Sequence, residues 1–177
     1  MPSPSGSTRS EAILTVPSAK LTIRSRMLIA GGVVFAIDRM SKWWIVEWLD
    51  LANIGRVEVV PPYLNFVMAW NRGINFGLFG GGSVWVLIIL SIAISVALIW
   101  WVYRQAGHEE GKARVPILAW GAGIVVGGAL GNAWDRLQYG AVADFLNMSC
   151  CGFNNPYAFN IADVAIFAGA ALIAFRA

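Results

Sequence analysis

Charged residues are scarce in this chain, and their scarcity excludes an ordinary soluble domain. Only 13% of the 177 residues are Asp, Glu, Lys or Arg, whereas 58% are hydrophobic. A soluble domain of this size needs many more polar side chains to cover its surface. The composition therefore predicts one small domain that crosses a membrane several times.

Metal-binding side chains are equally scarce. His108 is the only histidine, and the two cysteines, Cys150 and Cys151, are adjacent rather than spaced as zinc ligands are. Adjacent cysteines pair with each other only under strain, so we expect free thiols or an unusual vicinal bond and assign them no role. The sequence predicts no metal and no other cofactor.

Basic residues give the chain a pI of about 9.1, but they do not indicate a nucleic-acid partner. They flank the apolar runs, where anionic lipid accounts for them, so we expect no nucleic acid to bind. Eight of the thirteen basic residues flank the spans on one side of a four-span model, which predicts that this side and both termini are cytoplasmic. They are Arg9, Lys20, Arg24, Arg26, Arg104, Lys112, Arg114 and Arg176.

Four apolar stretches stand out, at about 27–49, 84–103, 115–137 and 160–175. Each is long enough, or nearly so, to cross about 30 Å of hydrocarbon as a helix. We therefore expect a mainly α membrane protein with four transmembrane helices. Residues 27–177 would form a single polytopic membrane domain, and residues 1–26 a disordered cytoplasmic tail with a basic flank. A cleaved signal peptide is the alternative for that tail.

The segment between the first two spans contains an alternating pattern typical of a strand. Apolar side chains recur at Leu64, Phe66, Met68 and Trp70, after the pair Pro61-Pro62 and before the glycines at 77 and 80–82. This predicts a small extracytoplasmic β-sheet or cradle, with an irregular loop as the alternative.

Two aspartates carry the strongest functional signal. Asp144 and Asp163 each lie beside an apolar segment on the predicted outer side, where an ionisable group is costly unless it faces protein or water. Two such groups suggest shared acid–base chemistry. Asn160 and Asp163 also have the spacing of a helix N-cap and its N3 residue, so simple capping is the alternative for Asp163.

Other polar groups accompany this pair. Asn132, Asp135 and Arg136 fall on one face of the third span, where the alternative is a glycine packing seam at Gly127 and Gly131 closed by an Asp135–Arg136 salt bridge. Asp38 and Lys42 are spaced for a mutual salt bridge. A turn is expected where the sequence supplies amides and glycine, at Asn71, Gly73 and Asn75.

These motifs together resemble the lipoprotein signal peptidases (signal peptidase II), aspartyl proteases of the bacterial inner membrane. The resemblance covers nearly everything from Met27 to Phe175, and Asn75 departs from it by replacing a small residue. The matching motifs are Asp38…Lys42; Asn71-x-Gly73-x-x-Phe76-Gly77; Gly131-Asn132-x-x-Asp135-Arg136-x-x-x-Gly140-x-Val142-x-Asp144-Phe145; and Phe159-Asn160-x-Ala162-Asp163.

The resemblance implies a catalytic pair, Asp144 and Asp163, at the periplasmic side of the inner membrane. It implies a prolipoprotein substrate whose junction cysteine carries diacylglycerol, membrane lipids as surroundings, and inhibition by globomycin. Residues that would line or support the site are Asp38, Lys42, Asn71, Gly73, Asn132, Asp135, Arg136 and Asn160.

Two carboxyls that share one water hold one proton between them, because two adjacent negative charges repel. Asp163 would lie in the first turn of a helix, whose dipole favours negative charge, so we expect Asp163 to be ionised and Asp144 to be the acid. A small ion- or proton-translocating subunit is the alternative function, and a structural assembly factor is a third.

Overall fold

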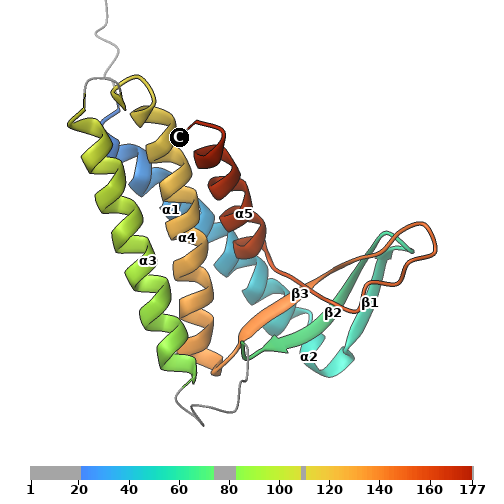
Figure 1. Ribbon diagram of the computed structural model, residues 1–177. Helices are drawn as coiled ribbons and strands as arrows, with labels where there is room; N and C mark the ends of the chain where they lie inside the picture. The colour runs from blue at the N-terminus through green and yellow to red at the C-terminus, as the bar shows by residue number, and fades with distance from the viewer. Residues whose placement is uncertain (1–20, 74–82, 109–110, 177) are drawn as a thin grey trace, which may run out of the picture.

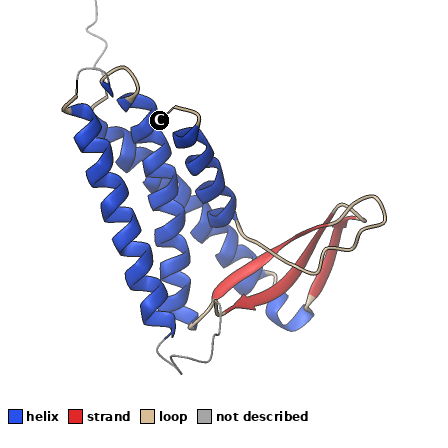
Figure 2. Cartoon of the chain, in the orientation of Figure 1, coloured by secondary structure: helices blue, strands red, loops and turns tan. Residues whose placement is uncertain are grey.

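The computed structural model describes residues 21–73, 83–108 and 111–176. Within these ranges the chain forms a helical bundle with a three-stranded sheet projecting from one side (Figures 1 and 2). The elements are α1 (Ile23–Lys42), the π-helix η1 (Trp43–Trp48), α2 (Leu51–Ile54), β1 (Arg56–Val60), β2 (Leu64–Asn71), α3 (Ser83–Ala106), α4 (Val115–Tyr139), β3 (Val142–Met148) and α5 (Ile161–Ala174).

Helix α4 is the centre of the bundle, because it packs against α1, α3 and α5 (Figure 1). Its glycines allow the close approach. A Cβ added to Gly127 would lie 2.5 Å from the carbonyl oxygen of Gly31 in α1, and one added to Gly128 would lie 2.6 Å from the carbonyl oxygen of Ala162 in α5. Larger side chains would push the helices apart. The predicted packing seam at Gly127 and Gly131 is confirmed: Gly127 meets α1 at Gly31, and a Cβ on Gly131 would lie 2.5 Å from Oδ2 of Asp38.

Two of the four expected spans meet the length and composition of a membrane helix in the described part of the chain. They are Val84–Ala106 in α3 and Val115–Tyr139 in α4. Helix α5 is apolar but has only 14 residues. Helix α1 carries several charges, among them Asp38, Arg39 and Lys42.

The first helix begins earlier than the apolar pattern predicts. It starts at Ile23 instead of residue 27, because Thr22 provides an N-cap whose Oγ1 accepts a hydrogen bond from the Ser25 backbone at 3.1 Å. Arg24 and Arg26, which were expected in a basic flank, therefore lie within α1. The rest of the predicted tail, residues 1–20, is outside the described residues.

The predicted strand at 64–70 is confirmed as β2, which lies between β1 and β3 in an antiparallel sheet. Phe66 pairs with Val57 and Leu146 on its neighbours, and these three side chains pack against a buried cluster of Ile45, Leu51 and Phe145. The sheet is thereby fixed to the end of the first helical segment.

A short turn connects α4 to β3. Gly140 ends the helix with φ of 70°, a conformation that glycine adopts without strain, and β3 begins at Val142. Asp144 consequently lies near the carboxyl end of α4, where the bundle meets the sheet.

Candidate active site

Asp144 and Asp163 come from different elements, and one residue contacts both. Asp144 lies on β3 and is 3% exposed, whereas Asp163 lies half-buried in the first turn of α5. The side-chain Nδ2 of Asn160 donates to Asp144 Oδ1 at 2.7 Å, and the backbone N–H of Asn160 donates to Asp163 Oδ2 at 3.2 Å. The two carboxyl groups therefore belong to one site.

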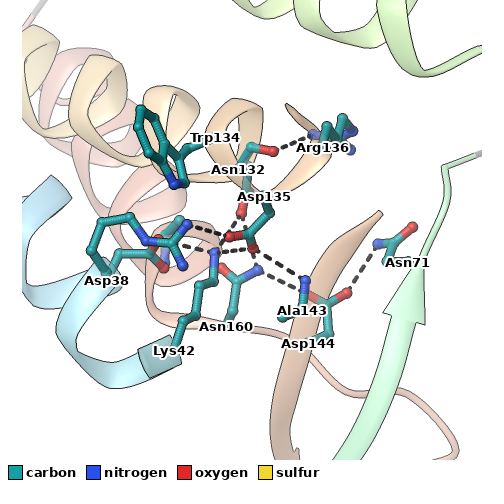
Figure 3. Close-up of polar contacts among 12 residues, drawn as sticks. Asp38, Lys42, Asn71, Asn132, Trp134, Asp135, Arg136, Ala143, Asp144 and Asn160 are labelled. Carbon is teal, nitrogen blue, oxygen red and sulfur yellow. Dashed lines mark hydrogen bonds and ion pairs between the residues drawn. The ribbon is translucent and has the colours of Figure 1, made fainter. Parts of the chain in front are cut away.

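The remaining carboxylate oxygens also accept hydrogen bonds from amides. Asn71 Nδ2 donates to Asp144 Oδ2 at 3.0 Å, as Figure 3 shows. Asn132 Nδ2 donates to Asp163 Oδ1 at 2.9 Å. Each carboxylate thus accepts two hydrogen bonds from neutral N–H donors, which orient it without cancelling its charge.

The amide of Asn132 has a fixed orientation. Its Oδ1 accepts hydrogen bonds from Lys42 Nζ at 3.2 Å and from Asn160 Nδ2 at 3.1 Å. Because an ammonium group can only donate, Lys42 directs the carbonyl side of Asn132 toward itself and leaves the NH₂ group for Asp163.

The predicted N-cap at the start of α5 is confirmed. Asn160 Oδ1 accepts a hydrogen bond from the backbone N–H of Asp163 at 2.9 Å. Asp163 Oδ2 accepts one from the backbone N–H of Asn160, which completes a capping box. Capping does not exclude a chemical role for Asp163, because its Oδ1 faces Asn132.

Burial raises the pKa of Asp144 from its usual 3.8 to about 6. The negative charge of Asp163 contributes to this increase, and the hydrogen bonds from Asn71 and Asn160 oppose it, so that about 6 is the net result. Asp144 is therefore suited to hold a proton near neutral pH, as an acid catalyst must.

A second cluster of charges, largely buried, lies beside the carboxyl pair. Lys42 Nζ is 2.9 Å from Asp38 Oδ2 and 2.7 Å from Asp135 Oδ2, and all three side chains are 0% exposed. Arg39 Nη1 is 2.6 Å from Asp135 Oδ1. Two carboxylates and two cations give this bracing cluster no net charge, as a buried ionic group requires.

The bracing cluster holds the backbone immediately before each aspartate of the pair. Asp135 Oδ2 accepts a hydrogen bond from the N–H of Ala143 at 3.1 Å, and Ala143 precedes Asp144 (Figure 3). Asp38 Oδ1 accepts one from the N–H of Ala162 at 3.1 Å, and Ala162 precedes Asp163. Since Lys42 binds both Asp38 and Asp135, it links the supports of the two chain segments.

Of the predicted ion pairs, Asp38–Lys42 is confirmed and Asp135–Arg136 is wrong. Within the described ranges Asp135 pairs with Arg39 and Lys42, which approach from α1. Arg136 Nη1 instead donates to the carbonyl oxygen of Asn132 at 3.2 Å, and the charges of Asp144 and Asp163 act on its guanidinium. Sequence reasoning missed Arg39, although it lies in the same apolar run as Asp38 and Lys42.

Gly73 contributes through its backbone. Its N–H donates to Asn71 Oδ1 at 2.9 Å, and its φ of 80° favours glycine. This turn leaves Nδ2 of Asn71 to face Asp144. Phe76 and Gly77 of the expected motif lie outside the described residues, as do Asn75 of the expected turn and the glycines at 80–82.

Metal-binding groups do not gather anywhere in the part of the chain that the structure describes: no three His, Cys, Asp or Glu side chains could hold an ion together. Cys150 and Cys151 are free and exposed.

Comparison with known proteins gives a consistent result. A family model described as signal peptidase (SPase) II matches residues 30–177. A lipoprotein signal peptidase of Rhodopseudomonas palustris (strain ATCC BAA-98 / CGA009) is 39% identical over 84% of this chain and 88% of its own length. One of Methylobacterium radiotolerans is 43% identical over 80% of this chain and 79% of its own length. A solved bacterial membrane enzyme superposes with a TM-score of 0.69 and 27% identity, over 84% of this chain and 90% of that chain.

Proposed function

The chain belongs to the signal peptidase II family, whose members remove signal peptides from prolipoproteins, and from that premise we propose that Asp144 and Asp163 are its catalytic pair. The observation that carries the proposal is the contact of one residue, Asn160, with both carboxyl groups. The enzyme is then an aspartic-type peptidase that uses no metal.

The two aspartates have different roles in this mechanism. Ionised Asp163 accepts a proton from a water molecule, and the resulting hydroxide attacks the scissile carbonyl carbon. Neutral Asp144 donates a hydrogen bond and then its proton to the carbonyl oxygen. As the tetrahedral intermediate breaks down, Asp163 gives its proton to the leaving amine and Asp144 takes a proton back from a hydroxyl group of the intermediate. The raised pKa of Asp144 and the helix dipole at Asp163 support this assignment.

Neighbouring residues position the pair. Asn71, Asn132 and Asn160 orient the carboxylates, and Gly73 fixes the amide of Asn71. Asp38, Lys42 and Asp135 hold the preceding backbone. Arg136 supplies positive charge beside the site, which would stabilise an oxyanion as it forms.

The proposed substrate is a prolipoprotein whose junction cysteine carries diacylglycerol, cut immediately before that cysteine. The chain would cross the bacterial inner membrane four times, with both termini in the cytoplasm and the site at the periplasmic side. The position of the site at one end of the bundle supports this arrangement, because the acyl chains could stay in lipid while the peptide bond reaches the carboxyl groups (Figure 1). Globomycin is the expected inhibitor.

The test is cleavage of a diacylglyceryl-modified prolipoprotein by the full chain in detergent or bilayers. Asp144→Asn and Asp163→Asn should each lower kcat by at least about a thousandfold, because each removes one proton-transfer group. The matched control is Asp50→Asn, a change at an exposed aspartate beside α2, which should leave the rate unchanged. Wild-type activity in either of the first two variants would exclude the proposed pair.

A further inference from the structure

A row of polar side chains crosses all three strands of the sheet. Asn65 on β2 pairs with Glu58 on β1 and with Asn147 on β3, and cross-strand partners lie on the same face. The next row, through Phe66, packs into the apolar cluster on the opposite face. The polar row therefore has a separate role from the packing of the sheet against η1 and α2.

The polar row borders a cavity of about 160 Å³ near the far end of the sheet. This volume is much larger than one water molecule needs. Asn65 is 2% exposed, and its Oδ1 is buried without a hydrogen-bond donor among the described residues. The cavity is lined by Arg56, Glu58, Pro61, Pro62, Asn65, Asn147, Ser149, Asn154 and Asn155.

A buried carbonyl oxygen without a hydrogen-bond donor is unfavourable, so this cavity favours a ligand that presents an N–H or O–H group. The neighbouring Asn147 does not have this need, because its Nδ2 donates to the carbonyl oxygens of Asn155 and Tyr157 at 2.7 and 2.9 Å. Asn65 is thus the residue in the cavity that most needs a donor.

Charges of both signs lie at the edge of the cavity. Arg56 and Glu58 are 56% and 61% exposed, and the 3.8 Å between Arg56 Nη2 and Glu58 Oε1 makes theirs a weak pair. Both side chains can bind an outside partner at little cost. A ligand with a positive and a negative group close together would match them.

Exposed apolar side chains surround this end of the sheet. Tyr63, Met148, Phe153 and Tyr157 are 56%, 55%, 67% and 76% exposed, and they neighbour cavity residues along the chain. In Figure 1 the sheet leaves the bundle near the end of α4 and slants back beside it, so that its far end lies level with the start of α5. Aromatic side chains at this level are typical of a membrane interface.

We propose that this cavity binds the headgroup of a membrane phospholipid that carries a primary ammonium group next to its phosphate. The ammonium donates to Asn65 Oδ1 and faces Glu58, while the phosphate faces Arg56. Tyr63, Phe153 and Tyr157 contact the lipid around it. This site lies beyond the catalytic pair and has no part in the peptide hydrolysis proposed above.

The experiment uses the full chain in bilayer nanodiscs that contain equal amounts of phosphatidylethanolamine, its N,N-dimethyl form and phosphatidylcholine. The lipid that stays bound after mild detergent extraction is identified by mass spectrometry. Wild type should retain the first two lipids about fivefold better than phosphatidylcholine, which has no N–H group. This comparison needs no variant and therefore does not depend on how well a variant folds.

Variants then assign the preference to the cavity. Asn65→Leu should remove it, whereas Asn65→Asp, which keeps an acceptor, should preserve it. Arg56→Gln should lower retention of all three lipids, because all carry phosphate. The matched control is Asn53→Leu, at an exposed asparagine on α2. Each variant should still cleave prolipoprotein, so loss of the lipid preference is separable from loss of the catalytic pair.

Three outcomes would overturn the proposal. Equal retention of the three lipids by wild type, or an unchanged preference in Asn65→Leu, would mean that the cavity selects no lipid headgroup. Equally strong binding of free phosphoethanolamine by the detergent-purified chain would identify a soluble ligand. If lengthening the mature part of the prolipoprotein improves cleavage by wild type but not by Asn65→Leu, the cavity binds the peptide chain of the substrate instead of a lipid.

Discussion

Two groups of carboxylates lie side by side in this molecule, and they are held in opposite ways. Asp38 and Asp135 are neutralised by Lys42 and Arg39 through ion pairs of 2.6–2.9 Å. Asp144 and Asp163 accept hydrogen bonds only from amides in the part of the chain described here. The first pair is held by cations, and the second by neutral donors that leave Asp144 with a raised pKa.

The difference shows why the amides matter. A lysine in direct contact with Asp144 would favour its ionised form and remove the acid. Asparagine orients a carboxylate with a smaller effect on its protonation, because the donor carries no net charge. Lys42 contacts Asn132, and Asn132 contacts Asp163. Lys42 therefore helps to position the Asp163 carboxylate without placing its ammonium group directly against it.

The largest effect should follow from breaking the bracing cluster. Lys42→Met leaves Asp38 without its cation in a buried site, so we expect the free energy of unfolding to fall by about 3–5 kcal/mol. Thermal or denaturant unfolding in micelles measures this change. The double variant Lys42→Met with Asp38→Asn should recover most of the loss, because Arg39 still balances Asp135. Unchanged stability in the single variant would contradict the role of Lys42.

A smaller effect is expected at Asp144, where the charged form of the carboxyl group lowers the stability of the folded state. Its pKa is about 6 in the folded chain against 3.8 for an unperturbed group, so the folded state binds the proton more tightly. Stability should therefore fall as pH rises from about 4 to about 6, by about 3 kcal/mol in total. Asp144→Asn should lack this fall.

The measurement is an unfolding series between pH 4 and 8 for wild type and Asp144→Asn. The informative quantity is the slope, since the variant also replaces a hydrogen-bond acceptor by a donor and so changes stability at every pH. Asp50→Asn should keep the wild-type slope. Parallel curves for wild type and Asp144→Asn would mean that Asp144 binds no extra proton on folding.

The smallest effect concerns a single amide. The hydrogen bond from Asn71 lowers the pKa of Asp144, so Asn71→Leu should raise it. Activity that requires protonated Asp144 declines as pH rises through that pKa. The alkaline limb of the kcat/KM profile should therefore move to higher pH, by less than about one unit. A shift to lower pH, or the same shift in Asn53→Leu, would refute this role for Asn71.

Local patterns in the sequence predicted the local parts of the site. The capping box at Asn160 and Asp163 and the salt bridge between Asp38 and Lys42 each join residues within one helical turn, and both are confirmed. The alternation from Leu64 to Trp70 predicted β2 for the same reason, because strand period is a local property.

Partners from different elements could not be predicted in this way. Asp135 was paired with its neighbour Arg136, but α1 packs close enough for Lys42 and Arg39 to reach it. The pairing depends on the glycine contact between Gly31 and Gly127, which a single sequence does not specify. The bonds from Asp135 and Asp38 to the backbones of Ala143 and Ala162 involve residues with no polar side chain to attract attention.

The two backbone bonds made by the bracing cluster determine where this chain can vary in length. A hydrogen bond joins Asp135, near the end of α4, to Ala143, at the start of β3. A residue inserted at the Gly140 turn between them would therefore displace Asp144 from the amides of Asn71 and Asn160. Among the described residues, a Cβ added at Gly152 in the loop after β3 would meet nothing within 4 Å, so added residues there would extend only the far end of the sheet. Engineered tags or natural insertions should accordingly be accepted at that loop and rejected at the turn.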